Sequence, residues 1–83
     1  MKIKLKLYAS LAEYLPEGAC RNVVDVEVPE DASLNAVIDR YRVPREMAHL
    51  VLVNGVFACQ KDRDGSLLKE GDHLAIWPPV AGG

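Results

Sequence analysis

Cysteine and histidine are scarce in this 83-residue sequence. Cys20 and Cys59 lie far apart without Cys-x-x-Cys spacing, and only His49 and His73 could join them. That set does not make the ligand pattern of a zinc site, so we expect no bound metal. We interpret both cysteines as free thiols of a reducing compartment.

An excess of charge of one sign is also lacking. Ten Lys and Arg against twelve Asp and Glu give a net charge of −2, which offers no basic surface for nucleic acid or for an anionic membrane. No apolar run approaches the roughly 20 residues that span a bilayer, and the alternating Lys and apolar residues of the N-terminus are unlike a signal peptide. We therefore expect a cytoplasmic protein that binds neither nucleic acid nor membrane.

Motifs for catalysis are missing as well. The sequence has no paired carboxylates, no nucleophile–base pattern and no phosphate-binding loop. Asp72 and His73 are adjacent, but no nucleophile accompanies them, so we interpret His73 as an ordinary surface residue. We expect a protein that is not an enzyme by itself.

Two early segments alternate apolar and polar residues with period two. Residues 2–8 alternate strictly, which predicts a half-buried strand with Tyr8 on the lysine side and partly exposed. Residues 21–28 alternate again, and the short connection between the two segments predicts an antiparallel pair. The residues expected to point into the core are Ile3, Leu5, Leu7, Val24, Val26 and Val28.

Helices are predicted at two places. Residues 9–14 favour a short helix with Ser10 as its N-cap, ended by turn residues 16–18. After helix-start signals at residues 30–33, apolar residues recur at the spacing of an amphipathic helix, which Pro44 limits. Its core-facing residues are Leu34, Val37, Ile38 and Tyr41.

A hairpin and a final strand are predicted for the second half of the chain. Residues 50–53 lead into Asn54-Gly55, a strong hairpin signal, and residues 56–59 form the returning strand. Residues 67–68 should dock onto the core before a last strand at residues 73–77. This order of elements predicts an α+β domain with a mixed sheet packed on one main helix.

The last six residues differ in composition from everything before them. Two prolines fix φ and remove two backbone donors, so the preceding strand cannot continue as a central strand. Two glycines without Cβ let the backbone pass through a narrow channel, and the chain ends in a carboxylate that is ionised at neutral pH (pKa about 3.5). We predict a domain at residues 1–77 and a carrier tail at residues 78–83, formed by Pro78, Pro79, Val80, Ala81, Gly82 and Gly83.

With this order of elements and this tail, the sequence resembles the ubiquitin-like β-grasp fold. More narrowly it resembles the MoaD/ThiS family of sulfur carriers, and within that family the small subunit of molybdopterin synthase. The resemblance covers essentially the whole chain, although Trp77 stands where a phenylalanine is expected. It is carried by Leu52-Val53-Asn54-Gly55, by the Glu70-Gly71-Asp72 turn, and by Pro78-Pro79-Val80-Ala81-Gly82-Gly83. Sulfur carriers for thiamine thiazole usually lack the two prolines of this tail.

The resemblance implies a two-stage chemistry on Gly83. A ubiquitin-activating-type adenylyltransferase would use ATP to join the Gly83 carboxylate to AMP, and a persulfide-bearing sulfur donor would displace AMP to leave a thiocarboxylate. The tail would then enter the large subunit of molybdopterin synthase and give its sulfur to a pterin precursor. The carrier itself would bind no cofactor.

A docking surface is implied too. Tyr8 and Trp77 lie opposite the expected core residues of their strands, and the family topology places the first and last strands next to each other. Phe57 matches a family position on the same face. We expect these three aromatic residues to dock against a partner, with the alternative that they cover the edge of the core in the free protein.

Two other functions stay open. One is a sulfur carrier for thiamine thiazole or amino-acid synthesis, and the other is a ubiquitin-like modifier whose Gly83 forms an isopeptide bond with a target lysine. The diproline at residues 78–79 favours the molybdopterin carrier, whereas the Gly-Gly terminus is common to all three.

Overall fold

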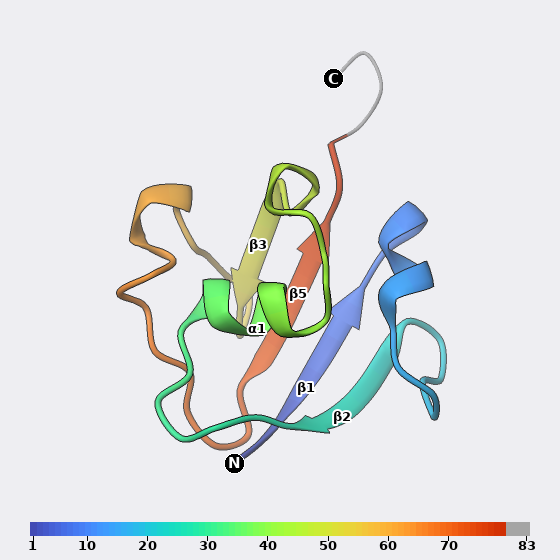
Figure 1. The fold of residues 1–83 in the computed structure, drawn as a ribbon, viewed down its shortest axis with the longest axis horizontal. Helices are drawn as coiled ribbons and strands as arrows, with labels where there is room; N and C mark the ends of the chain where they lie inside the picture. Colours follow the sequence, from blue (N-terminus) through green and yellow to red (C-terminus); the bar gives the residue numbers. More distant parts are fainter. Residues whose placement is uncertain (80–83) are drawn as a thin grey trace.

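A five-stranded sheet with one α-helix across one of its faces forms the fold (Figure 1). The computed structural model describes residues 1–79. The strands are β1 (Lys2–Leu7), β2 (Val23–Glu27), β3 (Leu50–Val53), β4 (Val56–Phe57) and β5 (His73–Trp77), the α-helix is α1 (Leu34–Arg40), and the 3-10 helices are η1 (Ala9–Tyr14), η2 (Arg45–Met47) and η3 (Gln60–Asp62). The sheet order is β2-β1-β5-β3-β4, with β1 and β5 parallel and the other neighbours antiparallel. The predicted α+β architecture is confirmed.

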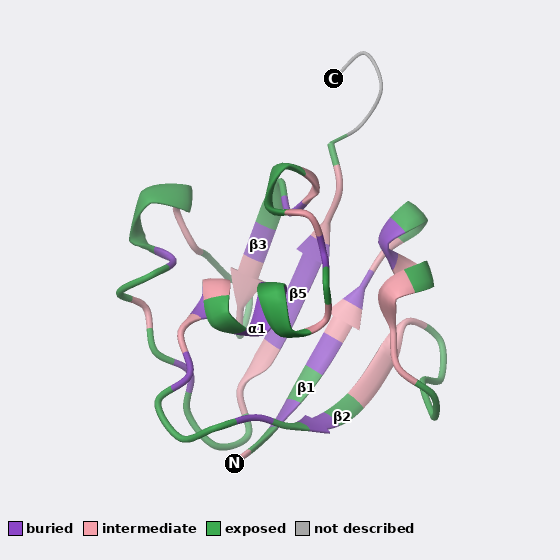
Figure 2. Ribbon diagram, in the orientation of Figure 1, coloured by how far each residue is buried: buried purple, intermediate pink, exposed green. Residues whose placement is uncertain are grey.

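The core lies between the sheet and α1, where buried residues alternate along β1 (Figure 2). Ile3, Leu5 and Leu7 are each at most 1% exposed, as their period-two spacing predicts. The antiparallel β1–β2 pair is confirmed, but β2 starts at residue 23 because residues 21 and 22 have positive φ. Val26 and Val28 are buried, whereas Val24, on the edge strand, is only half-buried.

Helix α1 begins where the sequence predicts. The Ser33 hydroxyl caps it by accepting a hydrogen bond from the Ala36 backbone N–H at 3.1 Å, which satisfies one of the unpaired donors of the first turn. Of the four residues expected to face the core, Leu34, Val37 and Ile38 are buried and Tyr41 is half-buried.

The C-terminal end of α1 closes with a Schellman motif. The Val43 N–H donates to the Ile38 carbonyl at 3.1 Å, and the Arg42 N–H donates to the Asp39 carbonyl at 3.0 Å. Arg42 has φ +61°, in the left-handed region that this motif requires. Glycine is the usual residue at such a position because a Cβ is disfavoured there.

Three local predictions are wrong in detail. Residues 9–14 form a 3-10 helix that begins after Tyr8 with no side-chain cap, so Ser10 is not its N-cap. Strand β4 ends at Phe57, two residues earlier than predicted, since the chain turns into η3. Leu68 is buried but Leu67 is 54% exposed, because neighbouring side chains of an extended segment point to opposite sides.

The predicted hairpin turn is confirmed, and Asn54 ties it to the start of β5. Asn54 and Gly55 have φ values of +51° and +83°, as a type I′ turn requires. The Asn54 side chain donates to the Asp72 carboxylate at 3.0 Å and accepts from the His73 N–H at 2.9 Å. The turn and the sheet centre are therefore linked by side-chain as well as backbone contacts.

Arg63 is a charged side chain buried to 3% exposure. Its guanidinium donates to the backbone carbonyls of Ala48 at 2.7 Å, His49 at 3.2 Å and Ala58 at 3.4 Å. Burial lowers its pKa below the ordinary value, although an arginine remains protonated at neutral pH. Arg63 thus joins the loop after β4 to the segment that enters β3.

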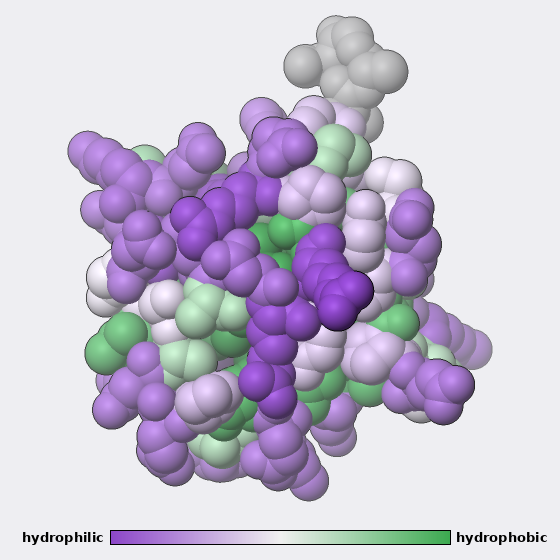
Figure 3. Space-filling view, viewed as in Figure 1, coloured by the Kyte–Doolittle hydropathy of each residue, from purple (hydrophilic) through white to green (hydrophobic). Residues whose placement is uncertain are grey.

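Seen from the helix side, the surface is covered largely by hydrophilic residues (Figure 3). Among residues 1–79, no helix combines the length and apolar character needed to cross a bilayer. The same residues contain no cluster of three His, Cys, Asp or Glu side chains placed to hold a metal ion. Cys20 is exposed and Cys59 is half-buried, both as free thiols.

Candidate functional site

The root of the predicted tail is held from both sides. The Tyr8 N–H donates to the Ile76 carbonyl and the His49 N–H donates to the Trp77 carbonyl, both at 3.1 Å, so the end of β5 is fixed between β1 and the segment that enters β3. Pro78 is half-buried and Pro79 is exposed. The described part of the chain ends before the remaining predicted tail residues, Val80, Ala81, Gly82 and Gly83. The tail and the domain boundary therefore stay predictions.

Tyr8 and Trp77 form an aromatic stack beside this root. Their ring centroids are 4.3 Å apart and the ring planes differ by 5°. The predicted adjacency of these two residues is confirmed, and it follows from the parallel pairing of β1 with β5. Both rings are half-buried, so each has exposed surface.

Strand register places the third predicted aromatic, Phe57, on the same face. Residues directly opposite each other in a ladder share a face of the sheet. Phe57 lies opposite Leu52, Leu52 lies opposite Ala75, and Leu50 lies opposite Trp77. We call the resulting apolar surface, on the sheet face away from α1, the outer patch: Tyr8, Leu50, Leu52, Phe57, Ala75 and Trp77.

Three members of the outer patch were not predicted from the sequence. Leu50, Leu52 and Ala75 belong to strands whose residues are nearly all apolar, β3 (Leu50–Val53) and β5 (His73–Trp77). A continuous apolar run is typical of a strand covered on both faces. That run is the signal that could have identified them, because a strand with one wet face alternates instead.

The other half of the same sheet face is charged. Lys4 Nζ lies 2.8 Å from the Asp25 carboxylate, and this hydrogen bond and the lysine's charge hold the pKa of Asp25 below its ordinary value. Lys6 lies opposite Ala75 and is half-buried at the border of the outer patch. A partner that covers the outer patch would therefore meet apolar residues near the tail root and a lysine at the border.

An apolar cavity of about 380 Å³ adjoins the outer patch at the tail root. Leu50 and Trp77 belong to both, so the cavity extends the patch toward the first tail residues. The residues lining it are Ala9, Ser10, His49, Leu50, Trp77, Pro78 and Pro79. An apolar partner side chain of modest size could enter here.

Comparison with known protein families assigns the chain to one of them. The sequence profile of the ThiS family matches residues 5–83. The chain belongs to the ThiS family. No curated protein sequence gives a significant match.

Solved structures agree with this ThiS-family assignment. SAMP1 from Haloferax volcanii is 30% identical over all of both chains, with a TM-score of 0.68. The Haloferax volcanii HVO 2177 protein is 25% identical over all of this chain and 87% of its own, with a TM-score of 0.75. One chain of the complex of subunits 1 and 2 of molybdopterin-converting factor from Helicobacter pylori aligns with this chain over the full length of both, at 19% identity and a TM-score of 0.58. At that identity the similarity shows a shared fold alone. The predicted β-grasp fold is confirmed.

This ThiS-family protein is thus a sulfur carrier of the ThiS/MoaD type or a modifier of the SAMP type. The small carrier proteins of this family are non-catalytic. The two Haloferax volcanii proteins are more similar to it than the molybdopterin-converting factor chain is. The comparisons therefore support the family more strongly than the narrower resemblance to the molybdopterin synthase subunit.

Proposed function

We propose that this ThiS-family protein carries sulfur as a thiocarboxylate on Gly83 and donates it to a pterin precursor, as the small subunit of a molybdopterin synthase. The observation that carries the proposal is the outer patch, an apolar sheet face that begins at the tail root and that α1 leaves uncovered. Such a surface beside a tail suits a carrier that docks and then delivers its terminus. The diproline at residues 78–79 favours the molybdopterin branch.

In this proposal the chemistry is supplied by partners in a reducing cytoplasm. A ubiquitin-activating-type adenylyltransferase lets the Gly83 carboxylate attack the α-phosphorus of ATP, which releases pyrophosphate and forms an acyl adenylate. A persulfide-bearing donor attacks the carbonyl carbon, and AMP leaves. A thiol then cleaves the sulfur–sulfur bond, and the terminal sulfur remains on Gly83 as a thiocarboxylate.

Geometry limits where the partner's active site can lie. Six extended residues span at most roughly 20 Å, so the reacting group cannot be farther than that from the end of β5. The cavity at the tail root and the part of the outer patch around Trp77 adjoin the start of the tail. Docking on the patch would therefore place Gly83 within reach of a buried site.

Intact-mass analysis tests the proposal. The protein is incubated with its activating enzyme, ATP and a persulfide donor, and we expect one oxygen to be replaced by sulfur in the intact chain. Deletion of Gly83 should abolish this mass change without altering the far-UV circular dichroism spectrum. If the truncated chain still delivers sulfur to a pterin acceptor, the tail is not the carrier.

A second candidate function is that of a protein modifier. The similarity to SAMP1, a small archaeal modifier protein by name, favours it. A modifier would appear in the same experiment as conjugates linked through Gly83 to lysine side chains of other proteins. Conjugates without any thiocarboxylate would replace the first proposal with this one.

A further inference from the structure

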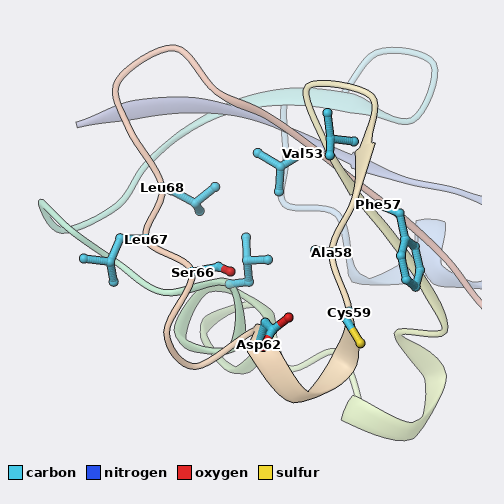
Figure 4. A pocket seen from close by; sticks show the side chains of 10 residues that line it. Val53, Phe57, Ala58, Cys59, Asp62, Ser66, Leu67 and Leu68 are labelled. Atoms are coloured by element: carbon cyan, nitrogen blue, oxygen red, sulfur yellow. The ribbon is translucent and has the colours of Figure 1, made fainter.

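A second apolar cleft, of about 350 Å³, lies at the opposite edge of the sheet from β2 (Figure 4). It separates the chain around Phe57 and Cys59 from the segment of residues 66–68 (Figure 4). Of the four large hydrophobic residues that are exposed in the described chain, three line it: Val56 at 68%, Phe57 at 57% and Leu67 at 54% exposure. Solvent-exposed apolar groups thus concentrate at this cleft.

The backbone of β4 presents unpaired hydrogen-bonding groups at this edge. The Ala58 N–H donates to the Val51 carbonyl at 2.8 Å, so residues 51 and 58 form a hydrogen-bonded pair. Hydrogen-bonded and non-hydrogen-bonded pairs alternate in an antiparallel ladder, so the N–H and C=O of Phe57 point away from β3. The Cys59 N–H also lacks a backbone acceptor among residues 1–79. These groups form a short open edge that another strand can pair with.

Asp62, in η3, is the one charged residue among those that line the cleft. Figure 4 shows it next to Ser66, beside the turn that follows Cys59. No ion pair or side-chain hydrogen bond engages its carboxylate within the described residues. A cation from outside the domain could pair with it.

We propose that this cleft binds an extended segment of a partner protein. The segment pairs with β4 as a sixth strand, places an apolar side chain in the cleft between Val56 and Leu67, and directs a Lys or Arg toward Asp62. Hydrogen bonds to the open edge supply the pairing, and the pocket and the carboxylate supply the selectivity. Strand β4 of a second copy would bring no basic residue, so a heterologous partner fits better than self-pairing.

The test uses the full chain, labelled with ¹⁵N, and a designed eight-residue probe in which Val, Leu and Arg alternate with Thr. Two matched probes are used as controls. One carries Glu in place of the Arg, and the other carries Pro in place of the Thr between the Leu and the Arg. We expect the Arg probe to shift the amide signals of Phe57, Cys59 and Leu67. The Glu probe should bind about fivefold more weakly because it loses the ion pair, and the Pro probe at least tenfold more weakly because it lacks a ladder donor.

Three variants of the protein assign the contacts. Leu67→Gln, at an exposed position, should weaken all the probes, and Asp62→Asn should remove the preference for the Arg probe over the Glu probe. Leu50→Gln, in the outer patch but outside this cleft, should leave probe binding unchanged. Because sulfur loading depends on Gly83, these results are independent of the proposed function.

Other outcomes would overturn the proposal. These are no shifts at about 1 mM probe, shifts confined to outer-patch residues other than Phe57, or equal binding of the Pro probe. Concentration-dependent shifts of β4 in the free protein would likewise overturn it, since they would identify a second copy as the occupant.

Discussion

Both faces of the sheet carry apolar residues, yet α1 covers only one of them. On the inner face Leu74 and Ile76 are fully buried under α1. On the outer face Leu50 is 37% exposed and the Tyr8–Trp77 stack is half-buried. The inner residues are accounted for by folding, because they form the core. The outer residues contribute less to folding and are better accounted for by a binding partner.

The largest expected effects separate the two faces by stability. Leu74→Ala, on the inner face, should lower the free energy of unfolding by about 2–5 kcal/mol, since it leaves a cavity in the core. Leu50→Ala, on the outer face, should cost less, about 1 kcal/mol, because 37% of this residue is already exposed to water. Urea denaturation measures both, and an equal loss from the two variants would show that the outer face is structural.

The next-largest loss of stability is expected from replacing the buried Arg63. Arg63→Met should lower the free energy of unfolding by about 2–4 kcal/mol, because the carbonyls of Ala48 and His49 lose a charged donor inside the protein. Arg45→Met is the matched control, since Arg45 is exposed and its ion pair with Asp39 lies on the surface. If both variants lose equally little stability, Arg63 does not hold the loop.

Binding should reverse the order of the two faces. Trp77→Ala should weaken docking to a partner at least tenfold, as expected for an aromatic residue at the centre of an interface. The same change should cost about 1 kcal/mol of stability through loss of the stack with Tyr8. Titration calorimetry with the activating enzyme checks the affinity. Affinity that is unchanged in a folded variant would mean that the outer patch is not the docking surface.

A small gain in stability should come from the helix end. Arg42→Gly should raise the free energy of unfolding by about 0.5–1 kcal/mol, because φ +61° is unfavourable for a residue with a Cβ. Arg42→Ala keeps the Cβ and should give no such gain. Since the helix end belongs to the inner layer, partner affinity should not change, and a change would contradict the separation of the two faces.

The smallest expected effect is on the loss of stability at acidic pH. The Lys4 contact lowers the pKa of Asp25 in the folded protein below the ordinary 3.8, so the carboxylate contributes stability above that pH and loses it as the pH falls through the folded value. Unfolding midpoints between pH 6 and pH 2.5 should therefore fall less in Asp25→Asn than in the parent chain. Equal acid dependence in the two proteins would show that this pair makes no contribution.

The sequence predicts what short-range patterns determine. Period-two alternation placed β1 and its core residues, the amphipathic spacing placed α1, and Asn54-Gly55 placed the hairpin turn. Ser10 was misassigned because a 3-10 turn that starts at a positive-φ Ala9 leaves no pattern distinct from a helix start. The ends of some elements were also predicted wrongly, because tertiary contacts rather than the local sequence decide where an element ends.

The site was predictable only where the strands themselves indicated it. Tyr8 and Trp77 have the parity opposite to core residues, so each could be placed on the outer face from its own strand. The apolar runs of β3 and β5 indicate strands covered on both faces, but only the register of β3 against β5 joins Leu52 and Ala75 into one patch. The three hydrogen bonds of Arg63 likewise join segments whose proximity only the fold creates.

The parallel pairing of β1 with β5 has a consequence for synthesis of the protein. The strand at the centre of the sheet is the last one made, and its partner in β1 lies 69 residues earlier, as in the pair Lys4 and His73. A nascent chain therefore cannot close its core until β5 has left the ribosome. Folding is completed only when the residues next to the tail have been added, so an incomplete chain would present neither a finished sheet nor an outer patch to a partner.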